Sequence, residues 1–475
     1  MMNLTRTEPS RKESTKMNFI GREKQLKQLA SALNMDKLNT TLIYGRRRVG
    51  KSELIKQAVK KTDAKIIYYE CRQIAEASNV KNICSMVSDI FNLPKLGFTS
   101  AEEIFEYIFQ LSEKEKVIFI LDEYPYLRET VKGIDSILQA LIDNYKGKAK
   151  LSLILLGSFM DIMKSLLAVS NPLYGRVDLT IELKQMDYYE SALFYPNFSD
   201  EDKVRIYSVF GGIPYYNQLI DDKQSVKENI LKLIAAPGAR LENEVSMYLS
   251  SEISKMANAN EVFAALAQNY SKYSDILAQS HVSSGPTLAD VLDRLIRMDV
   301  VERTAPINDE GNKKKAGYHI SDNLSLFYFR YIFRYLSQQK IMDEDVFYEK
   351  YISKDFEEWY VPHRFEQICR QYLIRQNKLG NITPPAEKIG KYYYDDPKNH
   401  TNGEFDVVTY DENGYVFYEV KFRKKPVTNQ MIDQEIEQVN KTGLRCYKYV
   451  FISRSGFEAK ETDEVKLIQL KELFS

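Results

Sequence analysis

Two glycines followed by a lysine and a serine form the pattern in this sequence that is best suited to chemistry. The pattern G-x-x-x-x-G-K-S follows an apolar run at 41–44, precedes a helical pattern at 53–60, and consists of Gly45, Arg46, Arg47, Arg48, Val49, Gly50, Lys51 and Ser52. Glycines at these positions let backbone N–H groups point at a phosphate, the lysine reaches the β- and γ-phosphates, and the serine hydroxyl coordinates Mg²⁺. The segment therefore predicts a binding site for a nucleoside triphosphate.

A pair of carboxylates ends another strongly apolar segment. The run at 116–121 has the uninterrupted apolar character of a parallel strand buried on both faces, and Asp122 and Glu123 follow it directly. Beside a phosphate-binding loop, Asp122 is suited to holding Mg²⁺, and Glu123 to acting as the general base that orients the attacking water. The alternative is a solvated strand end, which the loop upstream makes less favourable.

Two further residues are candidates for the same site. Ser158 follows the apolar run at 151–156, where a sensor of the γ-phosphate would lie, although serine is also an ordinary residue at a strand end. Arg176 lies in a loop at 172–176 before the next strand. It could stabilise transition-state charge as an arginine finger, or it could be a surface arginine, and one loop arginine is weak evidence for the first role.

The C-terminal third contains a second cluster of charged residues. Strand-like segments at 403–408 and 415–422 are joined through Asn413-Gly414, which is a strong hairpin signal. A loop at 411–414 would place Asp406 opposite Glu419, and a tighter turn would place it opposite Lys421. Both registers gather these three side chains on one strand face, because side chains alternate with period two.

Such a cluster is a plausible site for a hard cation. Asp406 and Glu419 would bind Mg²⁺ through oxygen, Lys421 would polarise water or a scissile phosphate, and Glu366 in a predicted upstream helix would complete a nuclease-like site. The alternative is a solvated sheet face that carries an ion pair.

The elements that must position these residues predict a multidomain α/β protein. Strands at 40–44, 65–71, 116–121, 151–156 and 178–183 alternate with helical patterns, which predicts a parallel sheet. The segment that follows is helical, and Gly211, Gly212 and Pro214 end one helix and begin another. A winged helix is predicted next, from helices at 261–269, 273–279 and 287–298 and strands at 300–303 and 317–320. Its basic residues either contact DNA phosphates or form a solvated face. The predicted units are a disordered tail at 1–17, an ATPase core at 18–195, a helical lid at 196–255, the winged helix at 256–340 and an α+β domain at 341–475.

Composition excludes several classes of protein. Lys and Arg total 66, as do Asp and Glu, so no overall basic charge indicates nucleic acid. Four cysteines without a C-x-x-C pattern argue against structural zinc and fit a reducing cytoplasm. No apolar run reaches the length of a membrane span, so we expect a cytoplasmic protein without membrane contact.

These motifs together resemble a family of prokaryotic ATPases described as archaeal-type, which lies near the AAA and STAND classes of P-loop proteins. The motifs that carry the resemblance are Phe19-Ile20-Gly21-Arg22-Glu23, Gly45 to Ser52, Leu121-Asp122-Glu123, Gly157-Ser158, Pro172 to Arg176 and Gly211 to Tyr216. The resemblance implies that the segment with Gly21 and Arg22 helps to seat adenine and that Pro214 contacts the nucleotide from the lid. It also implies ATP and Mg²⁺ as cofactors, which the absence of a guanine-reading N-K-x-D motif supports.

The same resemblance extends to the C-terminal domain. Members of the family often carry a winged helix and then a domain similar to restriction-endonuclease-like nucleases, whose PD-(D/E)xK motif matches Asp406, Glu419 and Lys421. Two hypotheses follow. The protein is an ATP-regulated, Mg²⁺-dependent DNase, or it is a non-nucleolytic ATP-dependent regulator. Its partner is then DNA, another protein or a second copy of the chain.

Overall fold

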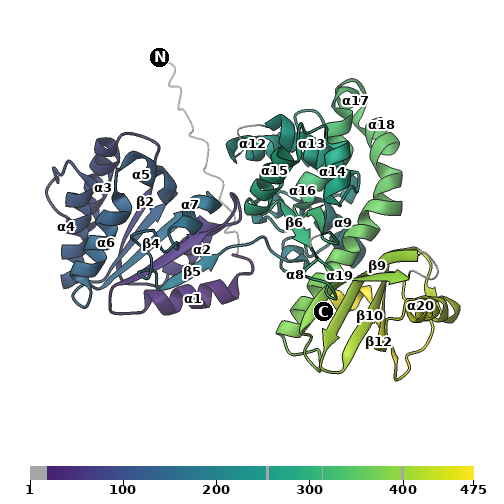
Figure 1. Ribbon diagram of the computed structural model, residues 1–475. Helices are drawn as coiled ribbons and strands as arrows, with labels where there is room; N and C mark the ends of the chain where they lie inside the picture. The colour runs from purple at the N-terminus through teal and green to yellow at the C-terminus, as the bar shows by residue number, and fades with distance from the viewer. Residues whose placement is uncertain (1–18, 253–255, 313, 397–400) are drawn as a thin grey trace, which may run out of the picture.

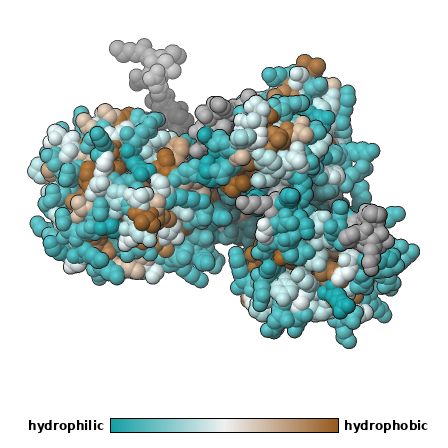
Figure 2. All heavy atoms as spheres, in the orientation of Figure 1, coloured by the Kyte–Doolittle hydropathy of each residue, from teal (hydrophilic) through white to brown (hydrophobic). Residues whose placement is uncertain are grey.

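The computed structural model describes residues 19–252, 256–312, 314–396 and 401–475, and the chain forms two parts that lie side by side (Figure 1). The tail predicted to be disordered at 1–17 lies outside the described residues. Figure 2 shows hydrophilic residues over most of the visible face of both parts, with hydrophobic residues in scattered patches. Within the described residues, no helix combines the length and apolar character needed to cross a bilayer.

The N-terminal part is a five-stranded parallel sheet with helices on both faces. Its strands are β1 (Asn39–Tyr44), β2 (Lys65–Glu70), β3 (Val117–Asp122), β4 (Leu151–Gly157) and β5 (Leu179–Glu182). Its helices are α1 (Glu23–Leu33), α2 (Lys51–Val59), α3 (Glu76–Phe91), α4 (Ala101–Lys114), α5 (Tyr124–Thr130), α6 (Ile134–Tyr145) and α7 (Met160–Ser165). The sheet order is β2-β3-β4-β1-β5, so β4 separates the strand before the phosphate-binding loop from the strand that ends in Asp122.

The apolar runs form these strands because both faces of the sheet are covered. Every residue of β1, β3 and β4 is buried, and neighbours along β1 alternate between two cores, with Leu42 in one and Ile43 in the other. Parallel strands buried in this way read as continuous apolar segments, which is why the sequence predicted them. All five predicted strands of the parallel sheet are confirmed to within about two residues.

The second part begins with helices and a small hairpin. The first group is α8 (Tyr188–Ala192), α9 (Asp200–Phe210), α10 (Pro214–Asn217), α11 (Val226–Ile230), the π-helical η1 (Leu231–Ala235) and α12 (Glu244–Glu252). The next group is α13 (Met256–Ala267), α14 (Tyr273–Gln279), α15 (Gly285–Arg297), β6 (Val301–Thr304) and β7 (Gly317–Ile320), with β6 and β7 antiparallel. The α15 helix begins where its sequence predicts a cap, because the Ser284 side chain accepts a hydrogen bond from the Thr287 N–H.

A run of helices then leads into a mixed sheet. The helical segments are α16 (Asn323–Phe327), η2 (Tyr328–Ile332), η3 (Phe333–Tyr335), α17 (Leu336–Ile341), α18 (Glu344–Tyr348), η4 (Glu349–Ser353), η5 (Phe356–Tyr360) and α19 (Val361–Lys378). The remaining elements are β8 (Lys388–Asp396), β9 (Thr401–Asp411), β10 (Gly414–Lys421), β11 (Val427–Thr428), α20 (Asn429–Lys441), β12 (Cys446–Ser453), β13 (Phe457–Glu458), β14 (Val465–Gln469) and η6 (Leu470–Leu473). The sheet order is β14-β12-β10-β9-β8.

The hairpin of β9 and β10 has the first of the two predicted registers. Tyr410 pairs with Tyr415 and Val407 with Tyr418, so one further step along this register places Glu419 opposite Asp406. The register is specified because a slip of one residue would move the buried Val416 and Tyr418 to the opposite face.

One continuous core joins helices α8 to α12 to the rest of the second part. Buried residues as distant in sequence as Phe210, Phe327 and Tyr418 belong to it, whereas the parallel sheet has its own cores. The helical segment after the parallel sheet therefore packs with the C-terminal half of the chain.

Candidate nucleotide site and C-terminal carboxylate cluster

The phosphate-binding loop has the backbone geometry that its glycines permit. Gly50 adopts a φ of 94°, which is strained for residues with a side chain, at the start of α2. Gly45 is required for close packing, because a Cβ atom there would lie 2.2 Å from the carbonyl oxygen of Leu183. The loop thus turns tightly between β1 and the N-terminus of α2, where N–H groups favour an anion.

Lys51 links the loop to the end of β4. Its Nζ atom donates to the backbone carbonyls of Gly45 and Arg46 at 2.8 and 3.1 Å and to Ser158 Oγ at 2.8 Å. The structure therefore brings the candidate sensor Ser158 directly to the lysine that would bind phosphate.

The candidate metal ligands also lie together. Ser52 Oγ donates to Asp122 Oδ2 at 2.7 Å, and the Tyr68 hydroxyl donates to the same carboxylate oxygen. Two hard oxygen donors at this spacing, beside a loop that can hold phosphates, fit Mg²⁺. Tyr68 was missed by the sequence reasoning. The pairing of β2 with β3 could have indicated Tyr68, because Glu70 of β2 pairs with Asp122. Tyr68 lies two residues before Glu70, so its side chain is on the same face of the sheet.

Glu123 occupies a special backbone position at the end of β3. It adopts a φ of 55°, and its carboxylate accepts hydrogen bonds from the N–H and hydroxyl of Ser158. Residues other than glycine rarely adopt this left-handed backbone conformation, and those that do are often found at functional sites. Lys51, Ser158 and Glu123 therefore form one connected hydrogen-bond chain at the carboxyl ends of β3 and β4.

A cavity of about 790 Å³ lies over this chain of contacts. Its lining includes the apolar or aromatic residues Phe19, Ile20, Met186, Phe194 and Tyr215 and the polar residues Lys51, Ser52, Glu123 and Ser158. The predicted residues Arg22, Arg47, Arg48, Val49, Gly50 and Pro214 also line it. Gly21 precedes α1 with a φ of 68° and supports the backbone turn that presents Phe19 and Ile20. The size and lining suit a nucleotide with its base against the apolar or aromatic residues.

Arg46 and Arg48 reach elements of the other core. Arg46 forms a buried ion pair with Asp322, and its guanidinium lies 4.3 Å from the ring centroid of Tyr248. Arg48 pairs with Glu244, whose other carboxylate oxygen accepts from the Tyr216 hydroxyl at 3.0 Å. No local pattern predicts these partners, because they lie about 200 to 280 residues away in sequence.

Arg176 is not brought to this site. Its guanidinium donates to both carboxylate oxygens of Asp143 at 2.9 and 2.7 Å and to the Pro172 carbonyl, and it does not line the cavity. Asp143 near the end of α6 pairs with Arg176 away from the cavity, as expected for a surface arginine, and the role of arginine finger stays a prediction.

ATP binding is expected to take up about half a proton per chain at pH 8 and roughly a tenth at pH 7. Burial lowers the pKa of Lys51 to about 8, against the raising effect of the Glu123 and Asp122 carboxylates, and phosphate charge would raise the pKa again. Calorimetric titrations in buffers of different ionisation enthalpy measure this uptake. A binding enthalpy independent of the buffer at pH 8 would contradict it.

The four predicted residues of the C-terminal cluster do converge. Glu366 of α19 lies near Asp406 of β9 and Glu419 of β10, close enough for their charges to affect its pKa. Lys421 pairs with Glu419 and, at 2.9 Å, with Glu435 of α20. The sequence reasoning missed Glu435, although its position on an amphipathic helix after the hairpin leaves it free to face the strand end.

Two carboxylates of this cluster, Asp406 and Glu419, are paired with lysines. Lys391 of β8, which the sequence reasoning also missed, pairs with Asp406 at 2.9 Å, and Lys421 holds Glu419. In the described ranges no group of three or more His, Cys, Asp or Glu residues is arranged to hold a metal ion. The predicted Mg²⁺ site at Asp406 and Glu419 therefore does not fit as the side chains stand, because ammonium groups take the place of the cation.

As pH rises from about 5 to about 8, the Glu366→Gln variant is expected to lose less thermal stability than the wild type. Burial, together with the nearby charge of Asp406, raises the pKa of Glu366 from 4.5 to about 8. The folded state then keeps a proton that the unfolded state releases, so stability falls as pH rises through the folded pKa. Melting curves across this range test the prediction. The exposed Glu358→Gln variant in η5 is a control that should follow the wild type.

Basic residues of the predicted winged helix are largely paired. Arg294 pairs with Asp290, Arg297 with Asp293 and with Asp161 of α7, and Lys315 with Asp309. Lys313 lies outside the described residues. The three helices and hairpin are present as predicted, and their role towards DNA stays a prediction.

Comparisons with known proteins agree with the N-terminal fold. Residues 19–220 match a family described as an ATPase domain predominantly from Archaea, and residues 328–437 match one described as archaeal and bacterial proteins of unknown function. The chain is 29% identical over 463 residues to MJECL04, an uncharacterized protein of Methanocaldococcus jannaschii. The aligned region covers 96% of this chain and 99% of that protein.

A solved structure is similar in fold. The Walker-type ATPase PABY2304 of Pyrococcus abyssi superposes with a TM-score of 0.50 and 20% identity, over 67% of this chain and 98% of that one. Together with the family match and the geometry of the loop, this likeness supports the fold of a P-loop ATPase for residues 19–220.

Proposed function

We propose that this protein is an ATP-dependent switch, which binds and hydrolyses ATP in its N-terminal part and transmits the nucleotide state to its C-terminal part. The observation that carries the proposal is the use of two arginines of the phosphate-binding loop, Arg46 and Arg48, as ion-pair partners of Asp322 and Glu244. A change in the loop on nucleotide binding would therefore act directly on elements of the other core.

The residues around the cavity support hydrolysis. Lys51 would exchange its contacts with two backbone carbonyls for phosphate oxygens, and the N-terminus of α2 would face the same anion. Bound Mg²⁺, held by Ser52 and Asp122, would neutralise charge on the phosphates. Glu123 would orient water and accept its proton, while Ser158, already bonded to both Glu123 and Lys51, would respond to the phosphate.

A short route of contacts leads from the loop towards the C-terminal sheet. Asp322 lies two residues after β7, and its carboxylate also accepts from the Ser325 N–H at the start of α16. The β6–β7 hairpin that precedes Asp322 is antiparallel and short, so a displacement of Asp322 would be passed to the segment between the two strands.

That segment is docked on the edge of the C-terminal sheet. The Ile307 N–H donates to the Lys391 carbonyl at 2.8 Å, and Asn308 exchanges two hydrogen bonds with the Tyr393 backbone at 2.8 and 3.1 Å. Ile307 is buried in the same core as Phe405. Because Lys391 pairs with Asp406, the route ends beside the carboxylate cluster. This contiguous set of contacts supports coupling between the two parts of the chain.

Two measurements test the switch. Wild-type protein should hydrolyse ATP with Mg²⁺, whereas Lys51→Ala should not, and the exposed Lys61→Ala should match the wild type. ATP should also change amide hydrogen exchange in 301–322 and 388–396. In an Arg46→Met/Asp322→Asn double variant, ATP should still bind but the exchange at 388–396 should no longer respond. ATP hydrolysis without any change in amide hydrogen exchange would contradict the coupling. Absence of ATP binding would contradict the whole proposal.

A second candidate function is a nuclease under control of this switch. The convergence of Glu366, Asp406, Glu419 and Lys421 favours it, and the resemblance to PD-(D/E)xK nucleases agrees with this set. The finer assignments that go with it are an AAA- or STAND-like subtype, a winged helix at 256–340 and a restriction-endonuclease-like domain at 341–475. DNA, a protein partner and a second copy of the chain remain the proposed partners. Lys391 and Lys421 pair with Asp406 and Glu419 where a metal ion would otherwise bind.

Cleavage of single- and double-stranded DNA with Mg²⁺, in the presence and absence of ATP, separates the two candidates. Cleavage that disappears in Lys421→Ala and persists in the exposed Lys460→Ala would support the nuclease. No cleavage under any condition, with ATP-dependent exchange intact, would leave a non-nucleolytic switch.

A further inference from the structure

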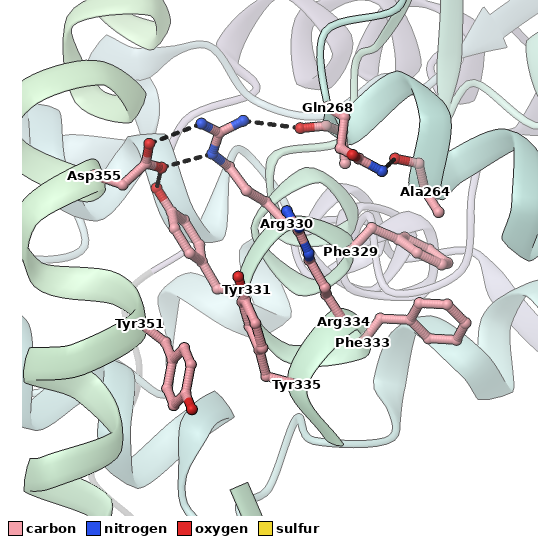
Figure 3. A pocket seen from close by; sticks show the side chains of 11 residues that line it. Ala264, Gln268, Phe329, Arg330, Tyr331, Phe333, Arg334, Tyr335, Tyr351 and Asp355 are labelled. Atoms are coloured by element: carbon pink, nitrogen blue, oxygen red, sulfur yellow. Dashed lines mark hydrogen bonds and ion pairs between the residues drawn. The ribbon is translucent and has the colours of Figure 1, made fainter. Parts of the chain in front are cut away.

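A second cavity, of about 710 Å³, lies in the C-terminal part of the molecule between the end of α13 and the segments η2, η3 and η4 (Figure 3). None of its lining residues belongs to the nucleotide cavity. Helical geometry is irregular here, because η2 and η4 are π-helical and η3 is a 3₁₀ turn. Such irregular windings are frequent at functional sites. The volume is in the range of pockets that enclose small ligands.

Aromatic rings form one wall of this cavity. Tyr335 of η3 and Tyr351 of η4 pack with ring centroids 4.4 Å apart and an interplanar angle of 32° (Figure 3). Both rings are partly exposed, as is Phe333. The two tyrosines keep each other in place, so they present a preformed aromatic surface at low cost in side-chain entropy.

Two arginines from the same stretch of chain have different surroundings. Arg330 is held by other residues of the chain, because it donates to both carboxylate oxygens of Asp355 at 2.7 and 2.9 Å and to the Ala267 carbonyl at 2.9 Å. It also lies 3.7 Å from the ring centroid of Trp359. Its charge is therefore compensated by Asp355, and this pair makes a rigid, neutral floor for the cavity.

Arg334 is the cation that remains for a ligand. It is exposed, lies 5.5 Å from the ring centroid of Tyr335, and has no carboxylate within ion-pair distance among the described residues. Together with the neutral Arg330–Asp355 pair, it gives this wall of the cavity a net positive charge beside an aromatic surface.

The geometry points to a binding site for a nucleobase with its phosphate, in which the base stacks on Tyr335, whose ring is held in place by Tyr351, and the phosphate pairs with Arg334. A planar guanidinium suits phosphate oxygens, and tyrosine rings stack on any base. An apolar ligand would leave the Arg334 charge unused, and a simple anion would leave the rings unused, whereas this ligand uses both. The nucleobase can belong to a free mononucleotide or to an unpaired residue of a nucleic acid strand.

Binding is measured on full-length protein in a Lys51→Ala background, which removes the phosphate lysine of the other site. The probes are AMP, by calorimetry, and a fluorescein-labelled oligothymidylate of about 12 nucleotides, by anisotropy. Binding of AMP would identify a mononucleotide site, and binding of the oligomer alone would identify a strand site. Adding Arg334→Ala should weaken the observed binding about tenfold or more and lower the salt slope by about one.

Tyr335→Leu should weaken the same binding roughly 5- to 100-fold, because it removes a stacking surface but leaves the charge. The exposed Arg445→Ala variant, which changes charge by the same amount elsewhere, should bind as the background does. The proposal is overturned if neither probe binds or if Arg334→Ala binds unchanged. It is also overturned if polyglutamate competes as well as the oligomer, since the site would then bind anions without reading a base.

Discussion

The Glu123→Gln variant is expected to bind ATP as tightly as the wild type and to hydrolyse it roughly 100-fold or more slowly. Glu123 lines the nucleotide cavity, and its carboxylate is held by two hydrogen bonds from Ser158. Glutamine preserves the shape and can still accept a bond from Ser158, but it cannot take a proton from water. The variant should therefore have a lower rate of ATP hydrolysis and an unchanged affinity for the nucleotide.

Phosphate release under saturating ATP and equilibrium binding of a nucleotide analogue measure the two quantities separately. Glu129→Gln is the matched control, because it makes the same change at an exposed position of the adjacent helix α5, outside the cavity. Full activity of Glu123→Gln would remove this residue from the chemical step. Loss of binding as well as hydrolysis would instead show that it serves the structure of the site.

The Arg46→Met variant is expected to lower the free energy of unfolding by about 3–5 kcal/mol. The side chains of Arg46 and Asp322 are only 6% and 2% exposed, so removing the guanidinium would leave a carboxylate buried without a countercharge. Burial alone would raise the pKa of Asp322, but the charge of Arg46 outweighs burial and holds that pKa below its ordinary value. The stability that this pair contributes is therefore present at neutral pH and is lost only as pH falls through the lowered pKa.

Adding the substitution Asp322→Asn to Arg46→Met tests whether the unpaired Asp322 charge causes the loss of stability. In Arg46→Met/Asp322→Asn the amide removes the buried charge and can still accept from the Ser325 N–H, so most of the loss should be recovered. Arg176→Met is the matched control, because it breaks the more exposed pair with Asp143 and should cost about 1 kcal/mol or less. Urea denaturation followed by fluorescence measures all three. A double variant as unstable as Arg46→Met would mean that packing, such as the contact with Tyr248, carries the effect.

Local patterns in the sequence were sufficient for the nucleotide site. Gly50, Lys51 and Ser52 lie within one loop and its helix, and Asp122 and Glu123 end a strand whose apolar run is continuous because both faces are buried. The carboxyl ends of parallel strands meet at one edge of a sheet, so placing the strands also placed these side chains together. The C-terminal hairpin was predictable for a related reason, since Val416 and Tyr418 on the buried face specify its register.

Tertiary structure alone decided how the parts are connected and which charges meet. Arg46 and Asp322 are 276 residues apart, and Lys391 joins Asp406 only because β8 pairs with β9 across a register shift. Arg176 was a candidate for the nucleotide site, but it pairs with Asp143, a partner that no spacing predicts. A periodic pattern reports which face of an element is buried, but not against which distant element, because packing depends on the combined shape and charge of both surfaces. The residues that gather at the phosphate-binding loop could thus be predicted from the sequence, whereas the ion pairs that join this loop to the rest of the protein could not.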